Sequence, residues 1–317
     1  MTAVIAPAAD ESLPVKPRSQ WLLFRRRFFR HKAAMFGLVV LTVIVVACFA
    51  ADLWVFYDPA KTSILEAGEG PSAAHWFGTD DNGRDYLTRI AYAGQLSLRI
   101  GFAVAFISTI VGASLGSIAG WVGGWLDEII SRIVDLFLIV PAIVFLAVVG
   151  RKISESDAFL WWDLGDEVLG YTIDRDTPII FALALFGWMA VARVTRAQVL
   201  SLKEKEFVEA ARAAGAPARR IIVRHILPNC VGVLMVNLTL AIAGAIVAES
   251  TLSFLGLGVQ EPQTSWGKMI ADAKGFIGTD KVFMLYFPGL MLLLTVLSVN
   301  FLGDGLRDAF DPRSRQE

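Results

Sequence analysis

EAARAAGAPARRIIVRHILP, residues 209–228, is a charged, alanine-rich stretch that lies between two long apolar runs. Alanine, glutamate and arginine favour a helix, and Gly215 can adopt the left-handed backbone that ends one. Pro217 suits the first turn of a second helix, and we expect Pro228 to separate that helix from the apolar run that follows. The stretch therefore predicts two short helices in water, held at both ends by membrane-spanning segments.

The composition of the 317-residue chain is that of a membrane protein. Hydrophobic residues make up 55% and charged residues 19%, with a mean hydropathy of +0.57, so a soluble domain is a poor description. A net charge of −1 gives no indication of nucleic-acid binding. A spanning helix needs about 20 apolar residues. Six runs meet that length, at residues 33–53, 96–119, 129–150, 178–200, 231–255 and 282–302.

Lysine and arginine are concentrated in alternate loops, which predicts the orientation in the membrane. Residues 1–32 hold seven of them and the loop 201–229 holds six, whereas the loops between hold few. We therefore expect residues 1–32 to be a cytoplasmic tail and surface helix, and residues 304–317 a cytoplasmic tail. Residues 33–303 then form a six-span domain in the plasma membrane that includes the cytoplasmic loop 201–229.

A stripe of small residues runs along the second predicted span. Gly112, Gly116 and Gly120 recur every four residues, a spacing that brings two helix backbones close together. The stripe predicts helix packing of one of two kinds. It either packs against another span of this chain or forms a seam with another subunit.

Few polar side chains lie within the predicted spans. Asn237, Glu249 and Asn300 are candidates for lining a transport path, because an ionisable group at membrane depth usually faces a cavity or a polar partner. The alternative for Glu249 is a hydrogen bond between helices without contact to any substrate. Asp135 has the spacing to pair with Arg132 on its own helix, which weakens a functional interpretation.

The sequence gives no indication of a catalytic, metal or nucleotide site. Its histidines are scattered, and Cys48 and Cys230 lack metal-ligand spacing, so we expect both cysteines to be buried small hydrophobes. A phosphate-cradling Gly-Lys-Ser/Thr loop is also missing from the sequence. We therefore expect no enzyme activity and no cofactor in the chain itself.

The helix pair in the loop 201–229 is the strongest candidate for contact with a partner. Its alanines leave a low surface, and Phe207 offers an apolar side chain that can enter a groove. The alternative is a solvated loop without a partner. Composition alone does not separate these two interpretations.

Several motifs together resemble the second permease subunit of dipeptide and oligopeptide ABC importers. The loop has the Glu-Ala-Ala, three residues, Gly pattern at Glu209 to Gly215, with Leu-Pro at 227–228. His225 departs from the general pattern and matches this subfamily. Further matching blocks are Tyr57-Asp58-Pro59, residues 75–80 (HWFGTD), 83–85 (GRD), 252–258 (LSFLGLG), 303–308 (GDGLRD) and Asp311-Pro312. The outer loop 151–177 is longer than is usual for the family.

The resemblance implies an all-α membrane protein with the six-span type I importer permease fold. It implies half of a heterodimeric pore, with a second permease, two ATPase subunits that bind ATP and Mg, and an extracytoplasmic peptide-binding protein. The cargo implied is di- or oligopeptides. A nickel or other small-solute importer of the same family is the alternative, and a self-sufficient channel or secondary transporter is a rival of another class. The implied ATPase-coupling residues are Glu206, Phe207, Glu209, Ala210, Ala211, Arg212, Gly215 and Ala216.

Overall fold

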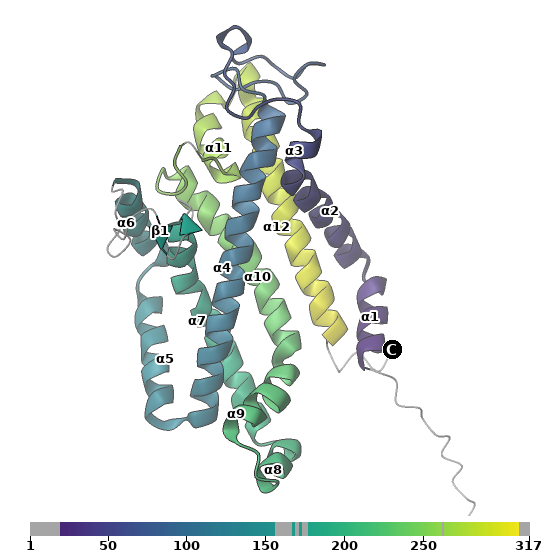
Figure 1. Ribbon diagram of the computed structural model, residues 1–317, viewed down its shortest axis with the longest axis vertical. Coiled ribbons are helices and arrows are strands. Elements are labelled where there is room, and N and C mark those ends of the chain that lie inside the picture. Colours follow the sequence, from purple (N-terminus) through teal and green to yellow (C-terminus); the bar gives the residue numbers. More distant parts are fainter. Residues whose placement is uncertain (1–19, 156–166, 169–170, 173–176, 262, 311–317) are drawn as a thin grey trace, which may run out of the picture.

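The computed structural model describes residues 20–155, 167–168, 171–172, 177–261 and 263–310 and is almost entirely helical (Figure 1). The N-terminal tail before residue 20, most of the outer loop 151–177 and the end of the C-terminal tail, including Asp311-Pro312, lie outside these ranges. The α-helices are α1 (Gln20–Arg30), α2 (Lys32–Phe49), α3 (Ala51–Trp54), α4 (Tyr86–Val122), α5 (Gly124–Ile139), α6 (Ala142–Glu155), α7 (Thr177–Lys203), α8 (Glu206–Ala213), α9 (Ala218–Ile221), α10 (Leu227–Phe254), α11 (Trp266–Ala273) and α12 (Phe283–Phe310). Single short turns of 3-10 helix cover Ile64–Glu66, Lys274–Phe276 and Asp280–Val282, and β1 (Glu167–Val168) pairs antiparallel with β2 (Tyr171–Thr172).

Five helical segments of the described chain are long and apolar enough to cross a membrane, and a bent pair can make a sixth span. The five are α2, α4, α7, the segment Ala218–Phe254 that contains α10, and the segment Asp280–Phe310 that contains α12. The second of them is longer than the apolar pattern predicted. Helix α4 extends from the Asp85 N-cap, whose side chain accepts from Thr88 N, to Gly123 at φ +68°. A polar N-cap and a glycine C-cap, rather than the ends of the apolar run, set its length.

The third predicted span is not one continuous helix. Helices α5 and α6 meet at a break and are bent by 78°. Pro141 lies at the break, and Val140 before it has the extended backbone, φ −79° and ψ 122°, that a following proline favours. The span expected at 129–150 is therefore a bent pair, because the apolar run passes through a proline that interrupts the helix.

Helix α4 packs along its length against α7 and also contacts α10, while α12 packs against α2 and α10. The glycine stripe of α4 faces α7. A Cβ at Gly112 would lie 2.5 Å from the Trp188 carbonyl oxygen, and one at Gly120 would lie 2.9 Å from that of Arg196. Gly116 faces the Ala192 carbonyl oxygen in the same way. The stripe is therefore occupied within the chain, and the alternative of a seam with another subunit does not fit.

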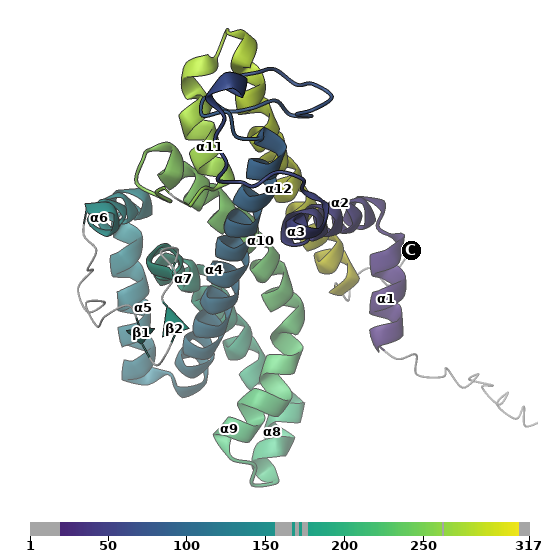
Figure 2. The same ribbon diagram turned by 45° about the horizontal axis from the view of Figure 1, so that its top comes forward.

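The helices bring predicted loops together at two ends of the bundle (Figures 1 and 2). One end holds α8, α9 and the turn between α4 and α5, and α1 and the end of α12 point the same way. The other end holds α11 and the loop that precedes α4. Among the described connections, the turn between α4 and α5 and the segment with α8 and α9 thus lie at one end, and the loop before α4 and the segment with α11 lie at the opposite end.

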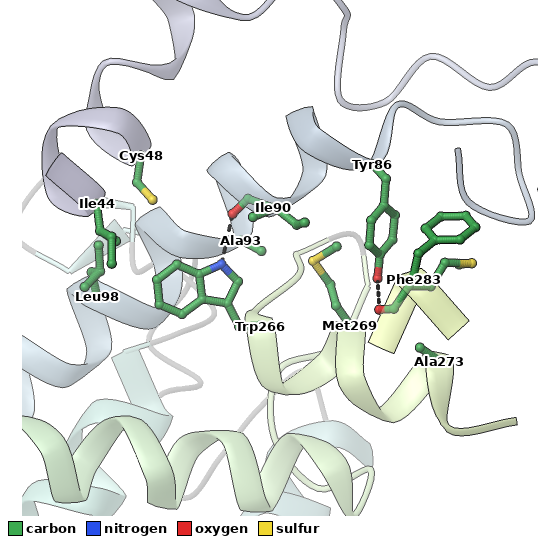
Figure 3. Close-up of a cluster of buried hydrophobic side chains, with 11 residues drawn as sticks. Ile44, Cys48, Tyr86, Ile90, Ala93, Leu98, Trp266, Met269, Ala273 and Phe283 are labelled. Carbon is green, nitrogen blue, oxygen red and sulfur yellow. Dashed lines mark hydrogen bonds between the residues drawn. The ribbon is translucent and has the colours of Figure 1, made fainter. Parts of the chain in front are cut away.

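The end that holds α11 has its own apolar core (Figure 3). Trp266 is fully buried there, and its indole N–H donates to the Ile90 carbonyl oxygen at 3.0 Å. The Tyr86 hydroxyl donates to the Met284 carbonyl oxygen at 2.6 Å. These bonds satisfy the polar atoms of large buried rings, and they join α11 and α12 to the start of α4.

The loop before α4 is folded around a buried carboxylate. Asp80 accepts from the Arg84 backbone N–H at 2.9 Å and from its Nε at 2.8 Å, and it also pairs with Arg89. Burial raises the pKa of Asp80, but the Arg84 backbone hydrogen bond, the charge of Arg89 and the side-chain hydrogen bonds from both arginines outweigh it and lower the pKa below its usual value. The loop is therefore held by a charged centre as well as by apolar packing.

Candidate partner-docking site

Helices α8 and α9 form a helical hairpin at the tip of the bundle (Figure 2). Gly215 joins them with φ +75°. Its N–H donates to the Arg212 carbonyl oxygen at 2.9 Å, and the Ala216 N–H donates to that of Ala211 at 3.1 Å. This pair of bonds is the Schellman end of a helix. The glycine therefore sets the angle at which the chain leaves α8, as the sequence predicted.

The second half of the hairpin is not separated from the span that follows. Residues 222–226 form a π-helix that leads directly into α10, and the Leu227 N–H donates to the Ile222 carbonyl oxygen. Pro228 lies in the first turn of α10. Proline lacks an N–H and crowds the preceding turn, and a π-bulge accommodates such a break without ending the helix. The expected separation at Pro228 was therefore wrong, and α9 continues through the π-helix into α10.

A small apolar core attaches the hairpin to the membrane-spanning helices. Val208 of α8 is fully buried, and it belongs to a cluster with Val199 of α7, Ile221 of α9 and Cys230 of α10. Both cysteines of the chain are buried and free, as expected. Because three segments meet at this core, the hairpin is fixed to α7 on one side and to α10 on the other.

Trp121, at the end of α4, adds a third attachment that the sequence did not indicate. The Arg212 guanidinium lies 4.7 Å from the centre of the Trp121 ring, and Lys203 Nζ donates to the Trp121 carbonyl oxygen at 2.7 Å. Such cation–aromatic contacts orient an arginine side chain along the ring. The sequence feature that could have predicted this contact is a tryptophan one residue before the C-terminal end of a spanning helix.

The predicted coupling residues divide between two sides of the hairpin. Glu206, Phe207, Glu209 and Ala210 are exposed, with 40% of Phe207 accessible. Ala211 and Ala216 instead pack against the apolar core of the hairpin, and Arg212 stacks on Trp121. The face of α8 that is open to another protein is thus short, carries two carboxylates and presents one aromatic ring over a low alanine surface.

The predicted path-lining residues are not brought together on an open surface. Glu249 is 0% exposed, and its carboxylate accepts from the Ser253 hydroxyl at 2.7 Å and lies 3.5 Å from that of Ser250. It is therefore buried within this chain, and its place on a transport path stays a prediction. Asn237 Nδ2 donates to the Val233 carbonyl oxygen of its own helix at 2.8 Å, and Asn300 is half-buried.

Charged pairs connect α5 to α7 where the sequence predicted a pair within α5. Asp135 pairs with Arg193, not with Arg132, which instead lies 3.8 Å from Glu128. Helix packing brings α7 opposite Asp135, and an exposed pair within one helix has little energy to compete with it.

A cavity of about 430 Å³ lies between α4, α5 and α7. Its wall includes Asp135 and Arg193, together with Arg196, whose Nη2 donates to Asp127 at 2.7 Å. Its charges are therefore paired across the gap. Among the described residues, no group of three His, Cys, Asp or Glu side chains is placed to hold a metal.

Comparison with known proteins identifies the family to which this architecture belongs. Residues 112–316 match the family described as the binding-protein-dependent transport system inner membrane component, and residues 19–71 match the N-terminal transmembrane domain of oligopeptide transport permease C. The oligopeptide transport system permease protein OppC of Haemophilus influenzae is 39% identical over 308 residues, 96% of this chain and 92% of that protein. OppC of Escherichia coli is 38% identical over 308 residues, 96% and 95% of the two chains.

Two further comparisons cover the whole chain and the fold. A putative peptide transport system permease protein of Brucella abortus is 39% identical over all 317 residues of both chains. Among solved structures, the inward-facing MetNI methionine ABC transporter superposes with a TM-score of 0.55 at 19% identity, over 70% of this chain and 96% of that chain. That likeness identifies the fold as the type I ABC importer permease fold. The chain therefore belongs to the family of binding-protein-dependent transport system inner membrane components, which are the non-catalytic permease subunits of ABC importers.

Proposed function

We propose that this chain is a permease subunit of an ATP-driven importer of di- or oligopeptides and forms half of a heterodimeric pore. Its mate is a second permease, with two ATPase subunits at one side and an extracytoplasmic peptide-binding protein at the other. The peptide cargo rests on relatives that are named as oligopeptide or peptide permeases and align over nearly the full chain. ATP and Mg bind to the ATPase partners.

The α8–α9 hairpin carries the coupling part of this proposal. The single observation behind it is the hairpin's attachment to three spanning helices: α7 through a two-residue turn and the shared apolar core, α10 through the π-helix, and α4 through Trp121. A surface held this way moves with the bundle as a unit. The exposed side chains Glu206, Phe207, Glu209 and Ala210 then enter a groove of an ATPase subunit, and its closure turns the spanning helices.

Charge at the proposed contact gives a test of coupling. Glu209→Lys reverses one exposed carboxylate, and creating a like-charge contact at an interface costs several-fold or more in affinity. The purified complex should lose ATPase subunits, or keep ATP hydrolysis that no longer responds to the peptide-loaded binding protein. Glu209→Asp, which keeps the negative charge at the same position, is the control and should stay near wild type. Normal retention and normal coupling in Glu209→Lys would leave the hairpin as a solvated loop.

The orientation follows from the positive residues and forms a separate proposal. Both termini and the α8–α9 hairpin face the cytoplasm. Reporter fusions at Gly70, Asp166 and Gly275 should show activity only of an extracytoplasmic reporter, and a fusion at Gly215 only of a cytoplasmic one. Cytoplasmic activity at any of the first three positions would overturn this assignment.

Deletion of the gene tests the cargo. An auxotroph that depends on a di- or oligopeptide should stop growing when this chain is missing and recover when it is restored. Normal peptide growth combined with lost nickel uptake would instead favour the small-solute alternative.

A further inference from the structure

Helix α1 is placed at the boundary of the membrane by the span that follows it. Helix α2 has 18 residues, about 27 Å of helix at 1.5 Å per residue, which is close to the hydrocarbon thickness of a bilayer. Only His31 separates the two helices, and it caps α2 by accepting from the Ala34 N–H at 3.0 Å. The residues just before Lys32 therefore lie at the level of lipid headgroups.

One face of α1 is already occupied by this chain. The Phe24 ring lies 4.5 Å from that of Phe310, and Phe28 stacks on Phe24 at 6.0 Å. His31 Nε2 lies 3.4 Å from an Asp308 carboxylate oxygen. The aromatic face thus attaches α1 to the end of α12, beside which it lies in Figure 1. This attachment fixes which residues point away from the protein.

The opposite face of α1 combines apolar and basic side chains. At 100° per residue, Leu22 and Phe29 fall on nearly the same line of the helix, with Arg25 on one side and Arg26 and Arg30 on the other. Leu22 is 52% exposed and Phe29 57%, and all three arginines are exposed. Within the described part of the chain, none of these three arginines forms an ion pair.

We propose that this face of α1 binds anionic phospholipid headgroups of the leaflet at its end of the bundle. The two apolar side chains enter the acyl boundary, and the flanking guanidinium groups donate to lipid phosphates. That arrangement is the one by which amphipathic surface helices bind membranes, and guanidinium groups pair with phosphate oxygens in a bidentate manner. Each basic residue near an anionic surface adds to the attraction, so lipids with net negative charge are preferred over zwitterionic ones.

Lipid titration of the full-length chain in detergent tests the proposal without any transport assay. After lipid removal, native mass spectrometry counts phosphatidylglycerol and phosphatidylcholine molecules bound at each concentration. The wild-type chain should prefer phosphatidylglycerol by about tenfold or more. The triple variant Arg25→Gln/Arg26→Gln/Arg30→Gln should lose most of this preference, and the corresponding triple lysine variant should keep most of it. An unchanged preference in the glutamine variant would overturn the proposal.

A second triple variant controls for charge alone. Arg219→Gln/Arg220→Gln/Arg224→Gln removes the same charge from exposed positions of the hairpin, which projects beyond the level of α1 (Figure 2). It should keep the lipid preference. An equal loss in this variant would mean that net charge rather than the face of α1 selects the lipid.

The depth of the apolar residues supplies an independent measurement. A cysteine introduced by Phe29→Cys should be protected from a water-soluble maleimide in nanodiscs that contain phosphatidylglycerol, whereas Ala214→Cys at the exposed end of α8 should react fully. Rapid labelling at both positions would overturn the proposal. So would protection that appears only when another protein subunit is added, because that result assigns this face to a protein partner.

Discussion

A substitution at Gly215 tests whether the backbone geometry of the α8–α9 hairpin, rather than the side chains on its surface, is needed for coupling. Gly215 has φ +75°, and a Cβ built there would meet no atom within 4 Å. The cost of Gly215→Val is therefore backbone strain alone. A left-handed conformation costs an L-residue about 1–2 kcal/mol, and a β-branched side chain falls at the upper end of that range. The Schellman bonds at Gly215 and Ala216 are the contacts that this strain opposes.

A strain of about 1–2 kcal/mol lowers the ratio of hairpins with the native Schellman turn to hairpins with a rearranged turn about 5- to 30-fold. The assay is peptide-stimulated ATP hydrolysis by the reconstituted complex, with the amount of bound ATPase measured in parallel. Gly215→Val should lower stimulation several-fold while the chain still inserts in the membrane. Gly215→Asn is the matched control, because asparagine tolerates the left-handed region, and it should stay near wild type. Equal coupling in the valine and asparagine variants would refute the reasoning.

Three further predictions concern packing and pH. Gly116→Leu forces a side chain into the α7 backbone and should destabilise the chain by about 1–3 kcal/mol or more, seen as a lower melting temperature in detergent, whereas Gly244→Leu, which enters open space, should melt near wild type. Trp121→Ala removes the surface on which Arg212 lies and should increase hydrogen exchange in α8 without changing α4; unchanged exchange would show that this contact does not hold the hairpin. Because the Asp80 pKa is lowered on folding, its stabilising effect is present above the unfolded value of about 3.9 and is lost as the pH falls through the folded pKa. Asp80→Asn should therefore make the loop before α4 more sensitive to proteolysis at pH 7, and the difference from wild type should shrink below about pH 4.

Proline residues explain two differences between the sequence-based expectations and the structure. The apolar run 129–150 was long enough to span, but Pro141 interrupts its backbone hydrogen bonds, and the result is the bent pair α5–α6. Pro228 was expected to end a helix, yet the π-helix before it allows the chain to continue into α10 although proline lacks an N–H. Apolar length therefore predicts that a segment reaches the membrane, whereas proline context decides whether it crosses as one helix.

The sequence by itself determined the spans, the hairpin and the family. An apolar run of about 20 residues has few alternatives to a membrane helix. Gly215 ends α8 through its own backbone angles. Both features therefore depend on residues that are close together in the sequence. Only the tertiary structure decided that the Gly112–Gly120 stripe faces α7, that Asp135 pairs with Arg193, and that Glu249 is fully buried. The physical reason is that each of these outcomes depends on helices that are distant in the chain and meet only when the bundle packs. Asp127 and Arg196 are 69 residues apart and meet only because α4, α5 and α7 pack together.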